Sequence, residues 1–132
     1  MPPISYARWR GWSGLGHIYA DVEIRASWAA RRVRMLVDTG ATYTIIPPQL
    51  ADEIGLVRLP FRVSVTLANG RQAKVEAGVA EISVAGRRAP ITVLVMEVAE
   101  PLLGSESLEA LGLRLDPSTG RLEPARGYAV RA

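Results

Sequence analysis

The sequence is short of several residue types that common active sites require. Its 132 residues include no cysteine, one histidine (His17) and one lysine (Lys74). Without cysteine there is no disulfide, no thiol nucleophile and no zinc–thiolate site. We interpret His17, on the polar side of an expected strand, as a solvated side chain rather than a metal ligand. We therefore expect neither a metal nor another cofactor.

Long apolar runs are also missing. The longest, residues 91–96, ends at Glu97, far short of the roughly 18 apolar residues that a membrane span needs. The basic residues Arg8 and Arg10 are not followed by the apolar stretch of a secretory signal. We expect no membrane association and, by default, a cytoplasmic location.

The charge pattern gives little support to nucleic-acid binding. The net charge is +3, and the basic residues are almost all scattered arginines. One dense cluster, Arg31, Arg32 and Arg34, is interpreted as a charged turn. A nucleic-acid interface would need a continuous basic face with interleaved aromatic residues, whereas most of the aromatic residues lie near the N-terminus. We expect no nucleic-acid partner.

The first half of the chain predicts strands. Residues 18–26 alternate apolar and polar side chains, as half-buried strands do. Residues 33–37 form a second, largely apolar strand, and a turn is expected at 27–32. The β-branched residues of 42–46 indicate a third strand.

A long hairpin follows. Residues 61–67 alternate again, and Asn69–Gly70 is among the strongest hairpin-turn signals. The return strand, 73–84, carries its apolar residues first at odd and then at even positions. That change of parity predicts a bulge or kink near Gly78.

Two short helices are expected. The first, 48–54, begins at a proline and ends at Gly55. The second, 105–111, is capped by Ser105 and ends at Gly112.

The remaining segments complete a β-rich chain. Residues 91–96 indicate a buried strand, and 113–123 a last hairpin. The fold class predicted is all-β, a small closed β-barrel with one or two short helices. We expect an irregular lead-in at 1–16, one domain at 17–124 and a tail at 125–132.

The segment Asp38–Thr39–Gly40 carries the candidate chemistry. The aspartate comes directly after an apolar strand, in a turn that the glycine makes possible. Two such carboxylates about 3 Å apart cannot both ionise, so they share one proton. The ionised partner then activates a water, and the protonated one polarises a carbonyl group. By itself the triplet also fits an ordinary turn with a capping aspartate.

The surroundings of this triplet resemble the retropepsin-like (retroviral-type) aspartic proteases over roughly residues 18–124. The resemblance consists of Leu36–Val37–Asp38–Thr39–Gly40–Ala41–Thr42, the Asn69–Gly70 hairpin, Ile91–Thr92–Val93–Leu94–Val95, and Leu102–Leu103–Gly104 before a helix. It implies an acid-protease barrel that acts as a homodimeric endopeptidase on peptide or protein substrates.

The same resemblance implies roles for the active-site loop. Asp38 is the expected catalytic aspartate, and Thr39 the expected reciprocal contact between subunits. Gly40 and Ala41 are expected to line the substrate cleft with backbone groups. Thr42 is also expected in the cleft, but it is neutral where retroviral members often have an acidic residue.

Two other segments gain roles from the resemblance. Asn69 and Gly70 are expected at the tip of a flap that closes over a bound peptide. Leu102, Leu103 and Gly104 are expected to form an apolar elbow that supports the active-site loop.

A two-carboxylate mechanism requires two chains. Asp38 is the one aspartate followed by Thr–Gly; Asp21, Asp52 and Asp116 are followed by Val, Glu and Pro. A two-fold dimer would bring both copies of Asp38 to its axis. Retroviral dimers interleave their chain ends, whereas 113–123 reads as a hairpin, so we expect the interface to differ in detail.

Two alternatives compete with proteolysis. One is a catalytically idle domain of the same fold that serves dimerisation or peptide binding. The other is phosphoryl chemistry, because Asp38–Thr42 loosely resembles the Asp-x-Gly-x-Thr phosphate loop of sugar kinases and actin-like ATPases. Those folds need a much longer chain, and no Walker-type loop is present.

Overall fold

The computed structural model describes residues 17–125. The predicted lead-in (1–16) and residues 126–132 of the predicted tail lie outside this range. No helix in the described part of the chain is long and apolar enough to cross a membrane. In chain order the elements are β1 (Tyr19–Arg25), β2 (Ala30–Asp38), β3 (Thr44–Ile46), α1 (Pro48–Ile54), β4 (Val63–Thr66), β5 (Gln72–Val84), β6 (Arg87–Val95), β7 (Leu102–Gly104), α2 (Ser105–Leu111), β8 (Leu113–Asp116) and β9 (Arg121–Pro124).

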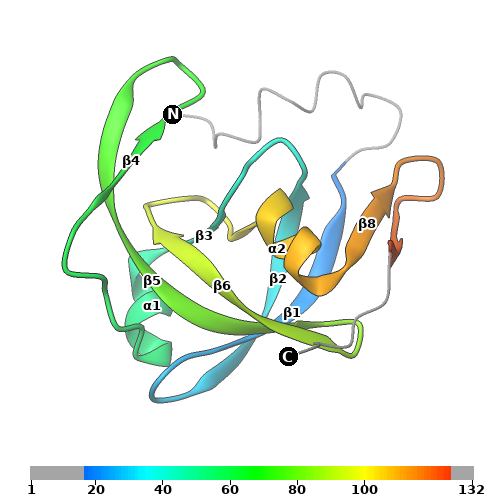
Figure 1. Ribbon diagram of the computed structural model, residues 1–132, viewed down its shortest axis with the longest axis horizontal. Coiled ribbons are helices and arrows are strands. Elements are labelled where there is room, and N and C mark those ends of the chain that lie inside the picture. The colour runs from blue at the N-terminus through cyan, green and yellow to red at the C-terminus, as the bar shows by residue number, and fades with distance from the viewer. Residues whose placement is uncertain (1–16, 126–132) are drawn as a thin grey trace.

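Six strands form a closed barrel (Figure 1). Their order is β1-β2-β7-β3-β6-β5, and a further pairing between β5 and β1 closes the circle. The pairs β2–β7 and β3–β6 are parallel, while β1–β2, β1–β5 and β5–β6 are antiparallel. Strand β4 extends the outer half of β5, and β8–β9 form a separate hairpin. The prediction of a small closed barrel with two short helices is confirmed.

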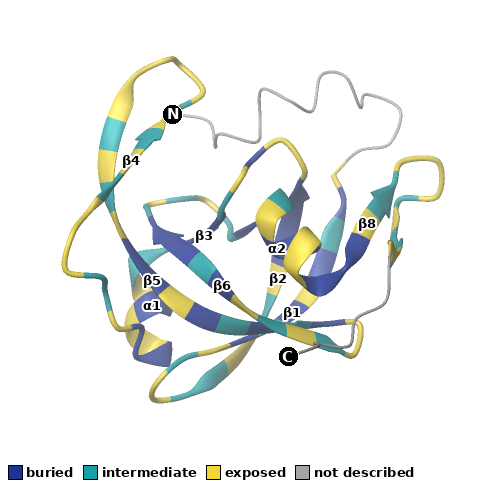
Figure 2. Ribbon diagram, in the orientation of Figure 1, coloured by how far each residue is buried: buried dark blue, intermediate teal, exposed yellow. Residues whose placement is uncertain are grey.

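Alternation along β1 builds the main core, as Figure 2 shows. Val22 and Ile24 are buried inside, while Asp21 and Arg25 are exposed. Each such apolar side chain contributes about 1.5–3 kcal/mol when it is fully buried. A second, smaller cluster lies on the opposite face of β2, β3, β6 and β7. Its buried members are Leu36, Ile45, Ala77, Leu94 and Leu102.

Strand β2 begins earlier than predicted. Arg31, Arg32 and Arg34 all belong to it and pair with residues of β1, so the interpretation of this cluster as a charged turn was wrong. The turn expected at 27–32 is present but shorter, because β2 already begins at Ala30. The pairing of Arg32 with Glu23 places opposite charges on neighbouring strands, which stabilises a sheet. This cross-strand partnership extends the strand into a segment that looks like a turn by composition.

Strand β5 changes its buried face without a bulge. Its pairing with β6 is continuous from Glu76 to Val84, so of the predicted bulge or kink near Gly78 the bulge was wrong. Val75 and Ala77 pack in the second cluster, whereas Ala80 and Ile82 pack in the main core. A regular strand that crosses from one cluster to the other produces the observed change of parity.

The predicted hairpin at Asn69–Gly70 is confirmed, and we call residues 63–75 the flap hairpin. The amide of Gly70 donates to the Leu67 carbonyl at 2.9 Å, and the Leu67 amide donates to the Arg71 carbonyl at 2.7 Å. Gly70 has φ +83°. This is a three-residue loop with the glycine in the left-handed region.

Both helices end as predicted. Gly55 and Gly112 adopt the left-handed conformation that terminates α1 and α2. Ser105 is the first residue of α2 rather than its cap, because Gly104 occupies the cap position and no side chain caps the helix. The predicted C-terminal hairpin is present as β8–β9.

Candidate active site

Asp38 is the last residue of β2 and is only 2% exposed. On one side, the Val37 amide donates to the Ile18 carbonyl at 2.8 Å. On the other side, β7 pairs in parallel register, with Asp38 opposite Gly104. Strands on both flanks therefore fix the backbone that carries this carboxylate.

The loop after Asp38 folds back on the carboxylate. The Gly40 amide donates to Asp38 Oδ1 at 3.1 Å, and the Ala41 amide donates to the Asp38 carbonyl at 3.1 Å. Asp38 Oδ2 is buried as well. Thr39 and Gly40 are exposed at the tip of this turn. A short polar side chain that binds the backbone two residues ahead is a common way to hold such a turn.

Gly104 allows the active-site loop to lie directly against β7. A Cβ atom at this position would be 2.5 Å from the carbonyl carbon and oxygen of Tyr43 and 2.9 Å from the oxygen of Thr42. This close approach allows the next two backbone amides to form hydrogen bonds with the loop. Ser105 donates to the Ala41 carbonyl at 2.7 Å, and Glu106 donates to the Thr42 carbonyl at 3.0 Å.

Two hydroxyl residues that the sequence did not indicate complete this support. The Gly104 amide donates to Thr44 Oγ1 at 3.1 Å, and Thr44 Oγ1 lies 2.6 Å from Ser107 Oγ. Thr44 and Ser107 are both buried. With Thr44 accepting from Gly104, its own hydroxyl proton can be donated to Ser107. Burial of these groups is tolerated because each has a hydrogen-bond partner.

The predicted elbow is buried where β7 meets the loop. Leu103 packs in the main core and Leu102 in the second cluster, and neither side chain is exposed. Leu102, Leu103 and Gly104 thus lie against the strand that ends at Asp38. Their position fits the predicted role of supporting the loop.

A cleft of about 300 Å³ lies between the active-site loop and the flap hairpin. Within the part of the chain that the structure describes, no charged side chain lines it. The residues that line it are Gly40, Ala41, Thr42, Tyr43, Ile45, Ser64, Val65, Thr66 and Leu94. Gly40, Ala41 and Thr42 are therefore brought to one cleft, as their predicted role requires.

The tip of the flap hairpin lies outside this cleft. Asn69 and Gly70 are exposed and do not line it, and a Cβ atom on Gly70 would meet no atom within 4 Å. The side chain of Asn69 accepts a hydrogen bond from the Arg71 amide at 3.0 Å and so holds the turn. A role of these two residues in binding substrate stays a prediction.

Tyr19 packs against the second cluster, whose members Ile45 and Leu94 also line the cleft. Its hydroxyl donates to Glu100 Oε1 at 3.1 Å, and the Arg34 guanidinium lies 4.0 Å from its ring centre. Burial, followed by the bond to Glu100, raises the pKa of Tyr19 above its ordinary value. The hydrogen bond to Glu100 thus favours the protonated phenol.

A larger hollow, of about 650 Å³, lies elsewhere on the barrel. Its lining includes Asp21, Glu23, Arg32 and Arg88 but not Asp38. Among residues 17–125, no three His, Asp or Glu side chains come together as a metal site. The larger hollow is therefore separate from the candidate site at Asp38.

Comparison with protein families identifies the chain. Residues 24–110 match the family described as "gag-polyprotein putative aspartyl protease". The chain belongs to this retroviral-type aspartyl protease family. The matched residues include the whole active-site loop and the flap hairpin. The resemblance found in the sequence is thereby confirmed.

A solved structure shows the same fold. The protease of EIAV, in complex with the inhibitor HBY-793, superposes with a TM-score of 0.62 and is 20% identical in sequence. The match covers 78% of this chain and 96% of the EIAV protein. Comparison with curated proteins gives no match. The aspartyl protease barrel is therefore the fold of this chain.

Proposed function

We propose that the protein is an aspartic endopeptidase that hydrolyses peptide bonds as a homodimer. The observation that carries this proposal is the position of Asp38, buried at the end of β2 beside an uncharged cleft that the flap hairpin covers. Membership of an aspartyl protease family supports the same chemistry. Each subunit contributes one Asp38, and the two carboxylates meet at the two-fold axis.

The chemistry follows from two carboxylates in one place. Like charges about 3 Å apart cannot both persist, so the pair holds a single proton. The ionised Asp38 removes a proton from a bound water, which attacks the peptide carbonyl carbon. The protonated Asp38 donates to the carbonyl oxygen. Collapse of the tetrahedral intermediate then breaks the C–N bond, with the leaving nitrogen protonated by the pair.

The backbone of the active-site loop prepares this arrangement. The Gly40 amide orients Oδ1 of Asp38, and α2 and β7 hold the loop from below. A carboxylate positioned in advance needs little reorganisation when charge develops in the transition state. Thr39, exposed at the tip of the turn, is available for the reciprocal contact with a second subunit.

The proposal is tested by cleavage of an unfolded protein between about pH 3 and pH 7, the range in which carboxylate pairs act. Asp38→Asn should abolish cleavage. The matched control is Asp21→Asn, an exposed aspartate on β1, which should cleave normally. Cleavage that survives Asp38→Asn overturns the proposal. Absence of cleavage by the unmodified protein favours the idle dimerisation or peptide-binding domain.

A further inference from the structure

The flap hairpin leaves the barrel at one residue of β5. Glu76 is the last residue of β5 that pairs with β6, opposite Val95. The next residue outward, Val75, is already paired with Val63 of β4. Any bending of the flap hairpin relative to the barrel must therefore be accommodated near Glu76.

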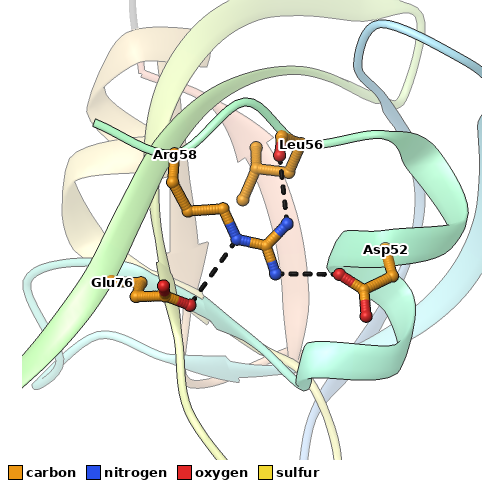
Figure 3. Close-up of polar contacts among 4 residues, drawn as sticks. All are labelled: Asp52, Leu56, Arg58 and Glu76. Atoms are coloured by element: carbon orange, nitrogen blue, oxygen red, sulfur yellow. Dashed lines mark hydrogen bonds and ion pairs between the residues drawn. The ribbon is translucent and has the colours of Figure 1, made fainter. Parts of the chain in front are cut away.

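All three nitrogens of the Arg58 guanidinium are engaged at this junction (Figure 3). Nε lies 3.6 Å from Glu76 Oε1, one terminal nitrogen donates to the Leu56 carbonyl at 3.1 Å, and the other donates to Asp52 Oδ1 at 2.9 Å. Asp52 belongs to α1. One side chain thus connects the base of the flap hairpin to the helix.

The backbone holds Arg58 close to β5. Arg58 forms an isolated bridge with Gly78, and the Leu59 amide donates to the Ala77 carbonyl at 2.8 Å. A Cβ atom on Gly78 would be 2.6 Å from the Val57 carbonyl oxygen. Gly78 therefore permits residues 57–59 to lie directly against β5, and this backbone contact ends at Leu59.

We propose that Arg58 is a positioning residue that ties the flap hairpin to α1 and limits how easily the hairpin opens. The role of the hairpin as a cover for substrate rests on the proposed function, but the tie itself does not. Arginine suits this place because its planar fork serves several acceptors at once, whereas lysine offers a single charged point. The Arg58 side chain is 27% exposed, but Asp52 is 70% and Glu76 49% exposed, so solvent screens both ion pairs and each is a weak contact.

The sharpest test uses two neighbouring acids of α1. Asp52 contacts Arg58, whereas Glu53 faces Arg31 at 4.0 Å. Asp52→Ala should speed amide hydrogen exchange in β4 and the outer half of β5 by about two- to fivefold, the size expected for loss of a surface ion pair. Glu53→Ala should leave that exchange unchanged. The amides of β6 should be unaffected in both variants.

A third variant shows whether the coupling passes through Arg58. Arg58→Met should speed exchange in the flap hairpin at least as much as Asp52→Ala, and Asp52→Ala should add nothing in the Arg58→Met background. The proposal is overturned if neither variant alters the flap hairpin, if Glu53→Ala has the same effect as Asp52→Ala, or if the two effects simply add.

Peptide kinetics provide a second readout that a purely structural role would not produce. If closed molecules become rarer, apparent substrate affinity falls with the closed fraction, so Arg58→Met should raise KM and leave kcat nearly unchanged. Hydrogen exchange is measured without substrate. A protein that cleaves nothing would therefore contradict the proposed function and still leave the exchange test of Arg58 decisive.

Discussion

Ala85, in the tight turn between β5 and β6, has the one positive φ among the non-glycine residues that the structure describes, at +52°. The left-handed conformation costs an L-residue about 1–2 kcal/mol, and asparagine tolerates it better. Ala85→Asn should therefore raise the free energy of unfolding by about 0.5–1 kcal/mol in urea denaturation. Ala85→Val, which is β-branched, should lower it; an increase with valine would contradict this explanation.

Gly104 is required by close approach rather than by φ. An added Cβ would lie 2.5 Å from the backbone of Tyr43, and a packed backbone cannot move aside cheaply. Gly104→Ala should lower the free energy of unfolding by about 1–3 kcal/mol and shift the amide resonances of the active-site loop. Ser105→Ala, at the next position, should stay within about 0.5 kcal/mol. Equal effects of the two substitutions would refute the argument.

At the residue scale, the sequence predicted what has a local signature. The two helix-terminating glycines, Gly55 and Gly112, were predicted correctly because a left-handed helix end restricts the residue type within a few positions. Thr44 and Ser107 were missed. Hydroxyl residues occur in many local settings, and these two meet only because the barrel brings distant segments together.

Among the elements, β3 is linked to β7 and α2 through the hydroxyl of Thr44. Thr44→Val keeps the shape but leaves the buried Gly104 amide without its acceptor, which costs about 1–3 kcal/mol. Thr44→Ser, which retains the hydroxyl, should recover most of the stability lost with valine. Thermal denaturation of both variants measures the difference. Unchanged stability in Thr44→Val would contradict a role of the hydroxyl, and equal losses in both variants would show that the methyl group matters as much as the hydroxyl.

The turn of the β8–β9 hairpin is held by one carboxylate. The hydroxyl and amide of Ser118 donate to Asp116 Oδ1 at 2.7 and 2.9 Å and lower the pKa of Asp116. The folded state thus favours the carboxylate, so this contribution to stability is present above the unfolded pKa and is lost as pH falls through the folded pKa.

Ser118→Ala tests this cause. It removes the strongest donor, so the pKa of Asp116 should rise toward its ordinary value in an NMR titration of the carboxyl carbon. The variant should then be less stable mainly above the unfolded pKa, and the stability of the β8–β9 hairpin should depend less on pH. A titration midpoint that does not move would show that another group lowers the pKa.

At the scale of elements, hydrophobic periodicity located most strands. It failed where pairing with other strands determines the structure of a segment. The change of parity in β5 predicted a bulge or kink; there is no bulge, because two separate clusters bury opposite faces of one continuously paired strand. Strand β7, with three residues, carries too few positions for a period and was recognised only as an apolar segment. The contacts of Arg58 with Asp52 and Glu76 join α1 to β5, two elements distant in the sequence, and no local pattern predicts them.

For the whole molecule, the proposed dimer predicts how active and inactive chains combine. If each active pair needs two Asp38 carboxylates, a randomised equal mixture of unmodified and Asp38→Asn chains should keep roughly a quarter of the activity. Independent subunits would keep about half. The mixture should be incubated until subunits exchange, and cleavage measured at a fixed total concentration. Retention of half the activity would contradict an active site shared between two subunits.

The parallel pairing of β2 with β7 also has a consequence for biosynthesis. The ribosome makes β2, which carries Asp38, early. Its partner β7 and the amides that bind the Ala41 and Thr42 carbonyl groups come from residues 102–106. A nascent chain on the ribosome cannot complete the turn after Asp38 until that late segment has emerged. Long-range pairing of this kind also folds slowly, which would delay any hydrolytic activity until translation of the barrel is finished.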